Sequence, residues 1–252
     1  MSTVGAATGL LDRVRNGALD LLFPKRCLGC RAWGALVCEQ CRSTVDSLRP
    51  PLCLRCGGPV GGAACASCRE NPLEVDDLRS VFAYDGLVRT AIIELKYHGL
   101  ACLGEELGVW MADRIDWPVS ADVMAGVPLH RGRQRERGYN QSALLAQALH
   151  QRFKLPLAGA AISRVRPTHP QVRLNGRSER AENVRNAFVA DRRIVEGRSV
   201  LIVDDVATTG ATVSACARAL KDAGAVRVVA LTLARDVSLI ARAEQTQRRT
   251  TW

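Results

Sequence analysis

The segment VLIVDDVATTGAT, residues 200–212, decides the fold. It begins with four aliphatic residues, and such a run is typical of a strand buried on both faces of a parallel sheet. Two adjacent acids and a loop of small residues follow, and we expect a helix to begin at about Ala211 and to end before Gly224. A further strand is predicted over residues 226–233. The segment therefore predicts an open α/β sheet.

The same segment predicts a sugar-phosphate site. Open α/β sheets bind ligands beyond the carboxyl ends of their strands, where carboxylates suit ribose hydroxyls and a hydrated Mg²⁺. The loop offers main-chain N–H groups, hydroxyls and a glycine, and the helix N-terminus favours a phosphate. The alternative, an acidic strand end before an ordinary Thr-capped helix, requires neither paired acids nor this glycine. The predicted site comprises Asp204, Asp205, Ala207, Thr208, Thr209, Gly210, Ala211 and Thr212.

These thirteen residues resemble the signature of the type I phosphoribosyltransferases, which bind 5-phosphoribosyl-1-pyrophosphate. The resemblance implies that Asp204 and Asp205 hold the ribose 2′ and 3′ hydroxyls and that residues 207–212 hold the 5′-phosphate, with Mg²⁺ bound beside the ligand. It also implies a type I phosphoribosyltransferase-like parallel sheet with flanking helices.

Cysteines form a second pattern, because eight of the ten fall before residue 70 as four C-x-x-C pairs. Two such pairs complete the tetrahedral thiolate set of a structural Zn²⁺, so two zinc ions are expected. Pairing in sequence order gives two ribbons, and the spacing does not exclude a cross-braced pairing. Disulfides or redox centres are the alternatives, disfavoured by the lack of a secretory signal and by four successive motifs. The predicted ligands are Cys27, Cys30, Cys38, Cys41, Cys53, Cys56, Cys65 and Cys68.

Length and composition predict two domains, since 252 residues with 47% hydrophobic content permit a full α/β core beside a small zinc module. We expect an N-terminal amphipathic helix within residues 1–24, with its apolar face over residues 10–22 docked on the ribbons or, alternatively, on a membrane surface. Without a long apolar run or an export signal, we expect no transmembrane segment and a cytoplasmic location. The other predicted parts are a double zinc ribbon at 25–72, a phosphoribosyltransferase-like domain at 78–236 and a tail at 237–252.

The middle of the chain predicts strands at 80–84 and 121–127, and helices over 87–97 and 103–115. A predicted loop then carries arginines at alternate positions and matches a pyrophosphate clamp, or else is a solvated basic loop. Asn140 and Gln141 are expected to cap or orient the next helix. Residues 164–188 read as a mobile flap whose arginines contact pyrophosphate or a polynucleotide backbone. The candidates in these two segments are Arg131, Arg133, Arg135, Arg137, Arg164 and Arg166.

Residues 20–235 as a whole resemble the ComF family. The resemblance rests on the cysteine pairs, the phosphoribosyl signature and several short motifs, namely Leu95-Lys96-Tyr97 with Gly99, Arg137 to Gln141, Thr168 with Gln171 and Leu174, and Asn183 with Phe188. Members of that family are cytoplasmic bacterial proteins similar to those needed for natural DNA uptake, so it implies partners in the DNA-uptake machinery. It also implies a double zinc ribbon joined to a phosphoribosyltransferase-like domain.

Two classes of function follow. In the first, the chain binds phosphoribosyl pyrophosphate with Mg²⁺ and is an enzyme only if a nucleophile displaces pyrophosphate; no general base and no nucleobase-selecting hood stand out. In the second, it is a non-catalytic protein that binds single-stranded nucleic acid, because a net charge of +10 attracts a phosphate backbone. Only 4% of residues are aromatic, so base stacking should be sparse, and Trp33, Tyr97 and Tyr139 are interpreted as packing residues. The ribbons alternatively dock a protein partner. Cys102 and Cys216 are expected to be buried.

Overall fold

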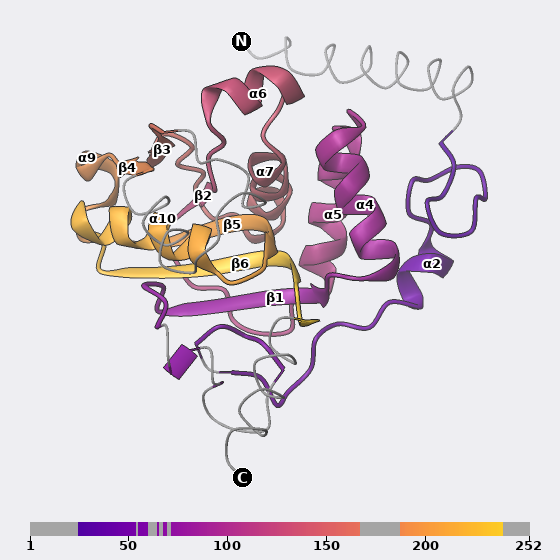
Figure 1. Cartoon of the computed structure of the whole chain (residues 1–252), viewed down its shortest axis with the longest axis horizontal. Coiled ribbons are helices and arrows are strands. Elements are labelled where there is room, and N and C mark those ends of the chain that lie inside the picture. The colour runs from indigo at the N-terminus through magenta and orange to yellow at the C-terminus, as the bar shows by residue number, and fades with distance from the viewer. Residues whose placement is uncertain are drawn as a thin grey trace, which may run out of the picture. The chain divides into compact units, whose positions relative to one another are not determined.

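The computed structural model describes residues 25–53, 55–59, 65, 68–69, 72–166 and 187–238 (Figure 1). The predicted N-terminal helix, residues 167–186 of the predicted flap and the tail beyond residue 238 lie outside the described residues. The chain divides into two compact units, Met1–Val45 and Asp46–Trp252.

The first unit is built around a cysteine turn. Cys27 begins the turn, and its carbonyl accepts a hydrogen bond from Arg31 N at 2.9 Å. Arg26 and Trp33 form an antiparallel bridge, with the Arg26 guanidinium 3.8 Å from the centre of the indole ring. The short helix α2 (Glu39–Ser43) follows. Backbone turns of this kind hold a small unit together without a large apolar core.

The second unit contains a four-stranded parallel sheet. Its strands are β1 (Asp77–Ala83), β2 (Val123–Gly126), β5 (Ser199–Ala207) and β6 (Arg227–Arg235), in the order β1-β6-β5-β2. The two central strands, β5 and β6, are buried along most of their length, as expected when helices cover both faces. The predicted fold class, a parallel α/β sheet with flanking helices, is confirmed.

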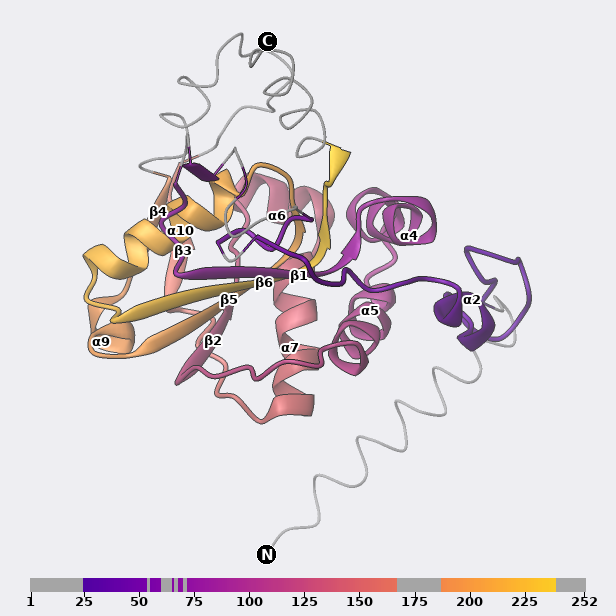
Figure 2. The same cartoon turned by 90° about the horizontal axis from the view of Figure 1, so that it is seen from below.

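Helices pack on both faces of this sheet (Figure 2). Helix α10 (Ala211–Asp222) covers one face, where Val213 and Leu220 share an apolar core with Val200 and Ile202 of β5. On the other face α7 (Gln141–Phe153) packs on β2 and β5, and α5 (Cys102–Asp113) packs on α7. Helix α4 (Gly86–Tyr97) precedes α5 in the connection from β1 to β2. In the described ranges no helix combines the length and apolar character needed to cross a membrane.

Two segments differ from their predicted forms. The predicted arginine loop is a short helix, α6 (Arg131–Arg137), which His130 caps and Gly138 ends in the left-handed conformation with φ 83°. The two ends of the predicted flap form an antiparallel pair, β3 (Ile162–Arg164) with β4 (Phe188–Ala190). The short helix α9 (Arg192–Val195) then leads into β5.

The second group of cysteines belongs to the same unit as the sheet. Leu78 N of β1 donates to the carbonyl of Arg55 at 3.1 Å, and Arg79 Nη1 donates to the carbonyl of Cys53 at 3.4 Å. The connecting segment is tied to α10, because Lys221 contacts Asp76 at 2.7 Å. All four cysteines of this group are buried in the apolar core that α10 also joins. This part of the cysteine module is therefore an extension of the sheet's core.

Candidate functional site

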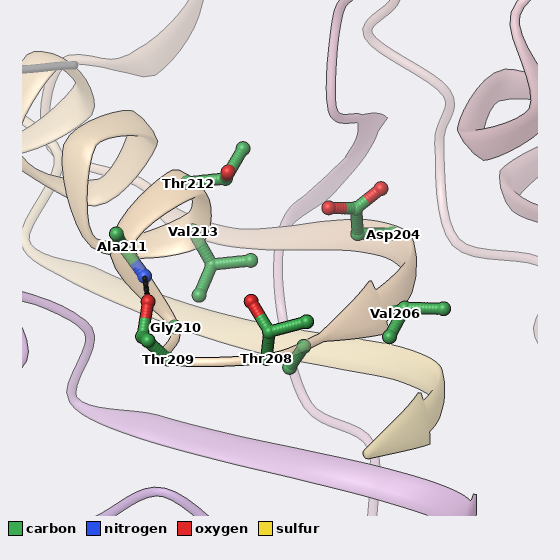
Figure 3. A pocket seen from close by; sticks show the side chains of 9 residues that line it. Asp204, Val206, Thr208, Thr209, Gly210, Ala211, Thr212 and Val213 are labelled. Atoms are coloured by element: carbon green, nitrogen blue, oxygen red, sulfur yellow. Dashed lines mark hydrogen bonds between the residues drawn. The ribbon is translucent and has the colours of Figure 1, made fainter. Parts of the chain in front are cut away.

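A pocket opens where β5 gives way to α10 (Figure 3). Its walls are Asp204, Val206 and residues 207–213, and its empty volume is about 250 Å³ including open solvent. All the residues predicted for the sugar-phosphate site line this pocket except Asp205. Consecutive residues line it because the chain reverses direction at the carboxyl end of a parallel strand, where α/β sheets form ligand sites.

The first turn of α10 forms one wall of the pocket. Gly210 precedes the helix with φ 81°, a left-handed conformation that glycine adopts without strain. Ala211 N donates to Thr209 Oγ1 at 3.3 Å, while the next N–H groups of the first turn have no acceptor within the helix. Leu73 covers Gly210, and a Cβ added there would lie 3.0 Å from Leu73 Cδ1. The pocket wall is therefore main chain with a partial positive charge.

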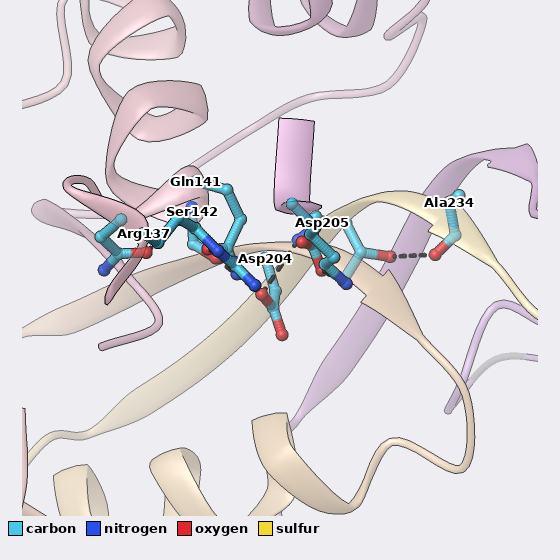
Figure 4. A network of polar contacts seen from close by, with 9 residues as sticks. Arg137, Gln141, Ser142, Asp204, Asp205 and Ala234 are labelled. Atoms are coloured by element: carbon cyan, nitrogen blue, oxygen red, sulfur yellow. Dashed lines mark hydrogen bonds and ion pairs between the residues drawn. The ribbon is translucent and has the colours of Figure 1, made fainter. Parts of the chain in front are cut away.

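Asp204 provides the acid in the pocket wall (Figure 4). Its Oδ1 accepts hydrogen bonds from Ser142 Oγ at 2.7 Å and from Asp205 N at 2.9 Å. Burial and then the charge of Asp205 raise the pKa of Asp204 to about 7, although the Ser142 hydrogen bond opposes this. Asp204 therefore changes its charge near neutral pH.

Asp205 takes part in a different contact. Because side chains alternate along a strand, it points away from the face that carries Asp204. Its Oδ1 lies 2.9 Å from Lys96 Nζ, and its side chain is 4% exposed. Burial alone would lower the pKa of Lys96, but attraction to Asp205 outweighs burial and raises it. The second oxygen, Asp205 Oδ2, is buried and has no hydrogen-bond partner among the described residues.

Ser142 and Lys96 are site residues that sequence reasoning missed. Ser142 is positioned by Asn140, which caps α7 by accepting from Ser142 N at 3.0 Å and is itself held by Val127 O. Gly126 permits this approach, because an added Cβ there would lie 2.7 Å from the backbone of Ser142. The predicted capping role of Asn140 is confirmed. The contact between Ser142 and Asp204 joins residues 62 positions apart, so no local pattern indicates it.

The α6 arginines do not form one cluster. Residues two apart on a helix lie on different sides, so Arg131 and Arg135 share one face while Arg133 and Arg137 lie on another. Three of the four are exposed, and Arg137 donates to Gln141 Oε1 at 2.5 Å. The predicted loop is therefore a helix, and its four alternate arginines lie on two of its faces.

Arg164, on β3, lies nearer the pocket than its position in the sequence suggests. Burial and then the charge of Arg133 lower its pKa, and the negative charge of Asp204 opposes them. Its guanidinium also lies 5.4 Å from the ring centre of Phe188. Arg164 is thus within electrostatic reach of both α6 and the pocket acid, whereas Arg166 is exposed.

Exposure separates the aromatic candidates. Tyr139 donates its hydroxyl to Leu95 O at 2.5 Å, as a packing residue does. Tyr97 is 71% exposed, with the Arg137 guanidinium 5.6 Å from its ring centre, and Trp33 is 58% exposed. The interpretation of Tyr97 and Trp33 as packing residues is wrong, because both rings face solvent.

The eight N-terminal cysteines form two separate four-thiol clusters. Within each cluster the sulfur atoms lie within 4.8 Å of one another, so the pairs combine in sequence order and not in a cross-braced pattern. All ten cysteines are free thiols, and of the two outside the clusters Cys216 is buried as expected while Cys102 is exposed. The first cluster is Cys27, Cys30, Cys38 and Cys41, and the second cluster is Cys53, Cys56, Cys65 and Cys68.

Both clusters fit a tetrahedral zinc ion. Each has a main-chain N–H directed at its first sulfur, from Cys38 N to Cys27 Sγ at 3.4 Å and from Cys65 N to Cys53 Sγ at 3.5 Å. Burial raises the pKa of Cys27 and Cys53, but such N–H donors outweigh it and lower both to about 6. A closed set of four thiolates is the usual structural site of Zn²⁺.

Sheet, pocket and cysteine clusters together define a phosphoribosyltransferase-like protein with a zinc-ribbon module. The double zinc ribbon domain family matches residues 18–71, and the phosphoribosyl transferase domain family matches residues 140–250. A DNA utilization protein, YhgH of Salmonella typhi, is 34% identical over 222 residues, which are 82% of this chain and 96% of the relative. The chain belongs to the ComF/YhgH family.

Other relatives are more distant in sequence. Competence protein ComFC of Bacillus subtilis is 29% identical over 79% of this chain and 84% of its own length. Competence protein F of Haemophilus influenzae is 28% identical over 84% of this chain and 98% of its own length. Among solved structures, the glutamine phosphoribosylpyrophosphate amidotransferase of B. subtilis is 26% identical, with a TM-score of 0.36 over 51% of this chain and 25% of that one. The family assignment rests on the sequence matches.

Proposed function

We propose that the second unit binds phosphoribosyl pyrophosphate with Mg²⁺ in the pocket beyond β5. One observation carries the proposal, namely that the buried carboxyl of Asp204 and the N-terminus of α10 line the same pocket. A sugar that carries a phosphate presents hydroxyl donors at one end and an anion at the other, which matches these two walls.

Each wall then has a defined role. The main-chain N–H groups of Thr212 and Val213, which have no acceptor within the helix, hold the 5′-phosphate together with the exposed hydroxyls of Thr208 and Thr209. Asp204 accepts hydrogen bonds from the ribose hydroxyls. Asp205 lies outside the pocket wall, with its Oδ1 paired to Lys96. Its buried Oδ2 has no hydrogen-bond partner among the described residues and is the group left to accept from the sugar.

Positive charge beside the pocket suits the pyrophosphate group. Arg164 lies within electrostatic reach of both Arg133 and Asp204, so an anion placed between the two arginines relieves their mutual repulsion. Mg²⁺ binds oxygen ligands and neutralises phosphate charge when present. For transfer to an acceptor, these residues would orient the sugar and steady the leaving group.

Calorimetry on the full chain tests this proposal, with Mg²⁺ and phosphoribosyl pyrophosphate as titrant. We expect Asp204→Asn to bind about 10-fold to 100-fold more weakly, the worth of a charge-assisted hydrogen bond. Glu196→Gln is the control, since this carboxylate is exposed and pairs with Arg192. No heat in the natural chain, or unchanged affinity when both Asp204 and Asp205 are replaced by Ala, contradicts the proposal. Release of pyrophosphate with pooled nucleobases and amines then distinguishes an enzyme from a binding protein.

A second candidate function is weak binding of single-stranded DNA, favoured by Tyr97. This exposed ring lies beside Arg137, and α6 adds three exposed arginines, so a base can stack on the ring while phosphates meet the helix. The names of the relatives, which refer to competence and DNA utilization, also suggest a role in handling incoming DNA, with partners in the uptake machinery.

A filter-binding assay over a salt series tests this second function. We expect affinity to fall steeply as salt rises, and Tyr97→Ala to weaken binding by about 1–3 kcal/mol. Tyr139→Phe, which removes only an inward hydrogen bond, is the matched control. Salt-independent binding, or equal affinities in the two variants, counts against the candidate.

A further inference from the structure

The two cysteine clusters differ in their contact with solvent. In the first cluster Cys30 is exposed, and Cys38 and Cys41 are half-buried. In the second cluster all four cysteines are at most 8% exposed. Four thiolates around a divalent zinc ion leave a net charge of −2. Water can solvate that charge at the first cluster, whereas at the second it lies in an apolar core and requires a counter-charge from the protein.

Arg235 is a buried cation with unmet hydrogen-bonding capacity. It is the last residue of β6 and is 3% exposed. Within the described part of the chain, its Nε and Nη1 atoms are buried and have no hydrogen-bond partner. The backbone is fixed, since the Arg235 carbonyl accepts from Tyr84 N at 2.8 Å. Burying a guanidinium away from water in this way costs folding free energy unless a negatively charged group lies next to it.

The second cluster lies close enough to be that negative group. Its peptide segments bond to Leu78 and Arg79 of β1, and β1 pairs with β6, the strand that ends at Arg235. The four cysteines pack in one apolar core with Ala207 of β5, and Ala207 stands opposite Arg235 in the sheet. Arg79, also near the cluster, is paired with Asp77 at 2.7 Å.

We propose that Arg235 is the buried counter-charge of a zinc tetrathiolate at the second cluster. It is a positioning residue and not a ligand, because its charge offsets the desolvated dianion while the four sulfurs hold the metal. Outer partners of this kind raise metal affinity by about 10-fold to 100-fold. The inference rests on the two zinc sites and is independent of the proposed ligand of the pocket.

Zinc release to a chromogenic chelator tests the proposal, because one chain carries both the affected site and an internal reference. The zinc-loaded full chain should release two ions, and a Cys30→Ser variant identifies the ion of the first cluster. We expect Arg235→Gln to weaken retention at the second cluster about 10-fold to 100-fold and to leave the first cluster unchanged. Arg227→Gln, an exposed arginine on the same strand, should behave as the natural chain does.

A conservative variant covers the case in which Arg235→Gln does not fold. Arg235→Lys keeps the charge and should retain zinc at the second cluster within a few-fold of the natural chain. Absorption of the cobalt-substituted protein reports whether the tetrathiolate shell is intact in each variant. Unchanged retention at the second cluster in Arg235→Gln, or equal losses in Arg235→Lys and Arg235→Gln, would overturn the proposal.

Discussion

Asp204 changes its charge near neutral pH, so the proposed ligand binding should depend on pH. Its pKa is raised from 3.8 to about 7, mainly by burial. If the carboxylate accepts the ribose hydroxyls, binding weakens as the pH falls through about 7. Ser142→Ala removes a hydrogen bond that lowers this pKa, so the midpoint should move to higher pH. Calorimetry over a pH series measures the shift.

Ser163→Ala is the control for that experiment, because its exposed hydroxyl donates to Val189 O within the β3–β4 pair. A midpoint that stays in place in Ser142→Ala would contradict the assignment.

The raised pKa of Asp204 also determines the direction in which the stability of the protein changes with pH. Between the unfolded pKa of Asp204 and its raised folded value the native state binds more protons, so the free energy of unfolding contributed by this group falls as the pH rises through that window.

Lys96 and Asp205 form an ion pair that should matter for stability. The Lys96 side chain is 21% exposed and that of Asp205 4%, so Lys96→Met leaves a buried carboxylate without its cation. We expect a loss of about 2–3 kcal/mol in the free energy of unfolding, measured with urea. Adding Asp205→Asn should recover at least half of that loss, since position 205 then carries no charge that needs Lys96. No recovery in the double variant would show that the loss is due to packing.

For single residues, the sequence predicts those site features that depend only on residues close by in the chain. The predicted site residues other than Asp205 line the pocket and follow closely on one another from Asp204 to Thr212. A strand, a turn and a helix therefore place them without contacts from distant parts of the chain. The partners of the acids come from α4 and α7, far away in sequence. No pattern in residues 200–212 indicates that Ser142 or Lys96 meets them.

The element that joins the second cluster to the sheet depends on Gly57. This residue has φ 62°, and an added Cβ would lie 2.5 Å from the carbonyl oxygen of Leu78 in β1. We expect Gly57→Ala to lower the free energy of unfolding by about 3 kcal/mol, from left-handed strain and the clash together. Gly99 has φ 73° and open space around it, so Gly99→Ala should lose only about 1 kcal/mol. Equal losses in urea unfolding would exclude the clash.

Helices and strands with a clear apolar period were predictable, and polar ones were not. Residues 87–97 and 103–115 carry buried positions at helical spacing, and they form α4 and α5. The segment RGRQRER has no apolar face, so its helix shows no such period. Strand β5 runs beyond the acids to Ala207, because β6 continues to pair with it as far as Arg235. Pairing with a strand from another part of the sequence therefore determines where β5 ends.

Across the whole second unit, the second cluster is connected to the pocket through a short chain of contacts. Arg55, between two of its cysteines, donates to the carbonyl of Leu73 at 3.0 Å. Leu73 packs over Gly210 at the start of α10. At the other end of the loop, Ala207 O accepts from Asp236 N, the residue after Arg235. Both ends of the pocket loop are therefore supported by residues that lie next to this cluster.

Loss of the second zinc should therefore loosen the pocket, whereas loss of the first should not. Cys68→Ser removes one of the four zinc ligands inside the apolar core. We expect the free energy of unfolding to fall by about 3 kcal/mol, which would lower Tm by about 6–12 °C. Hydrogen exchange over residues 207–213 should quicken in this variant because Leu73 no longer holds the loop. Cys30→Ser acts in the other unit, so exchange over these residues should match the natural chain. If both variants quicken exchange equally, or neither does, the second cluster does not support the pocket.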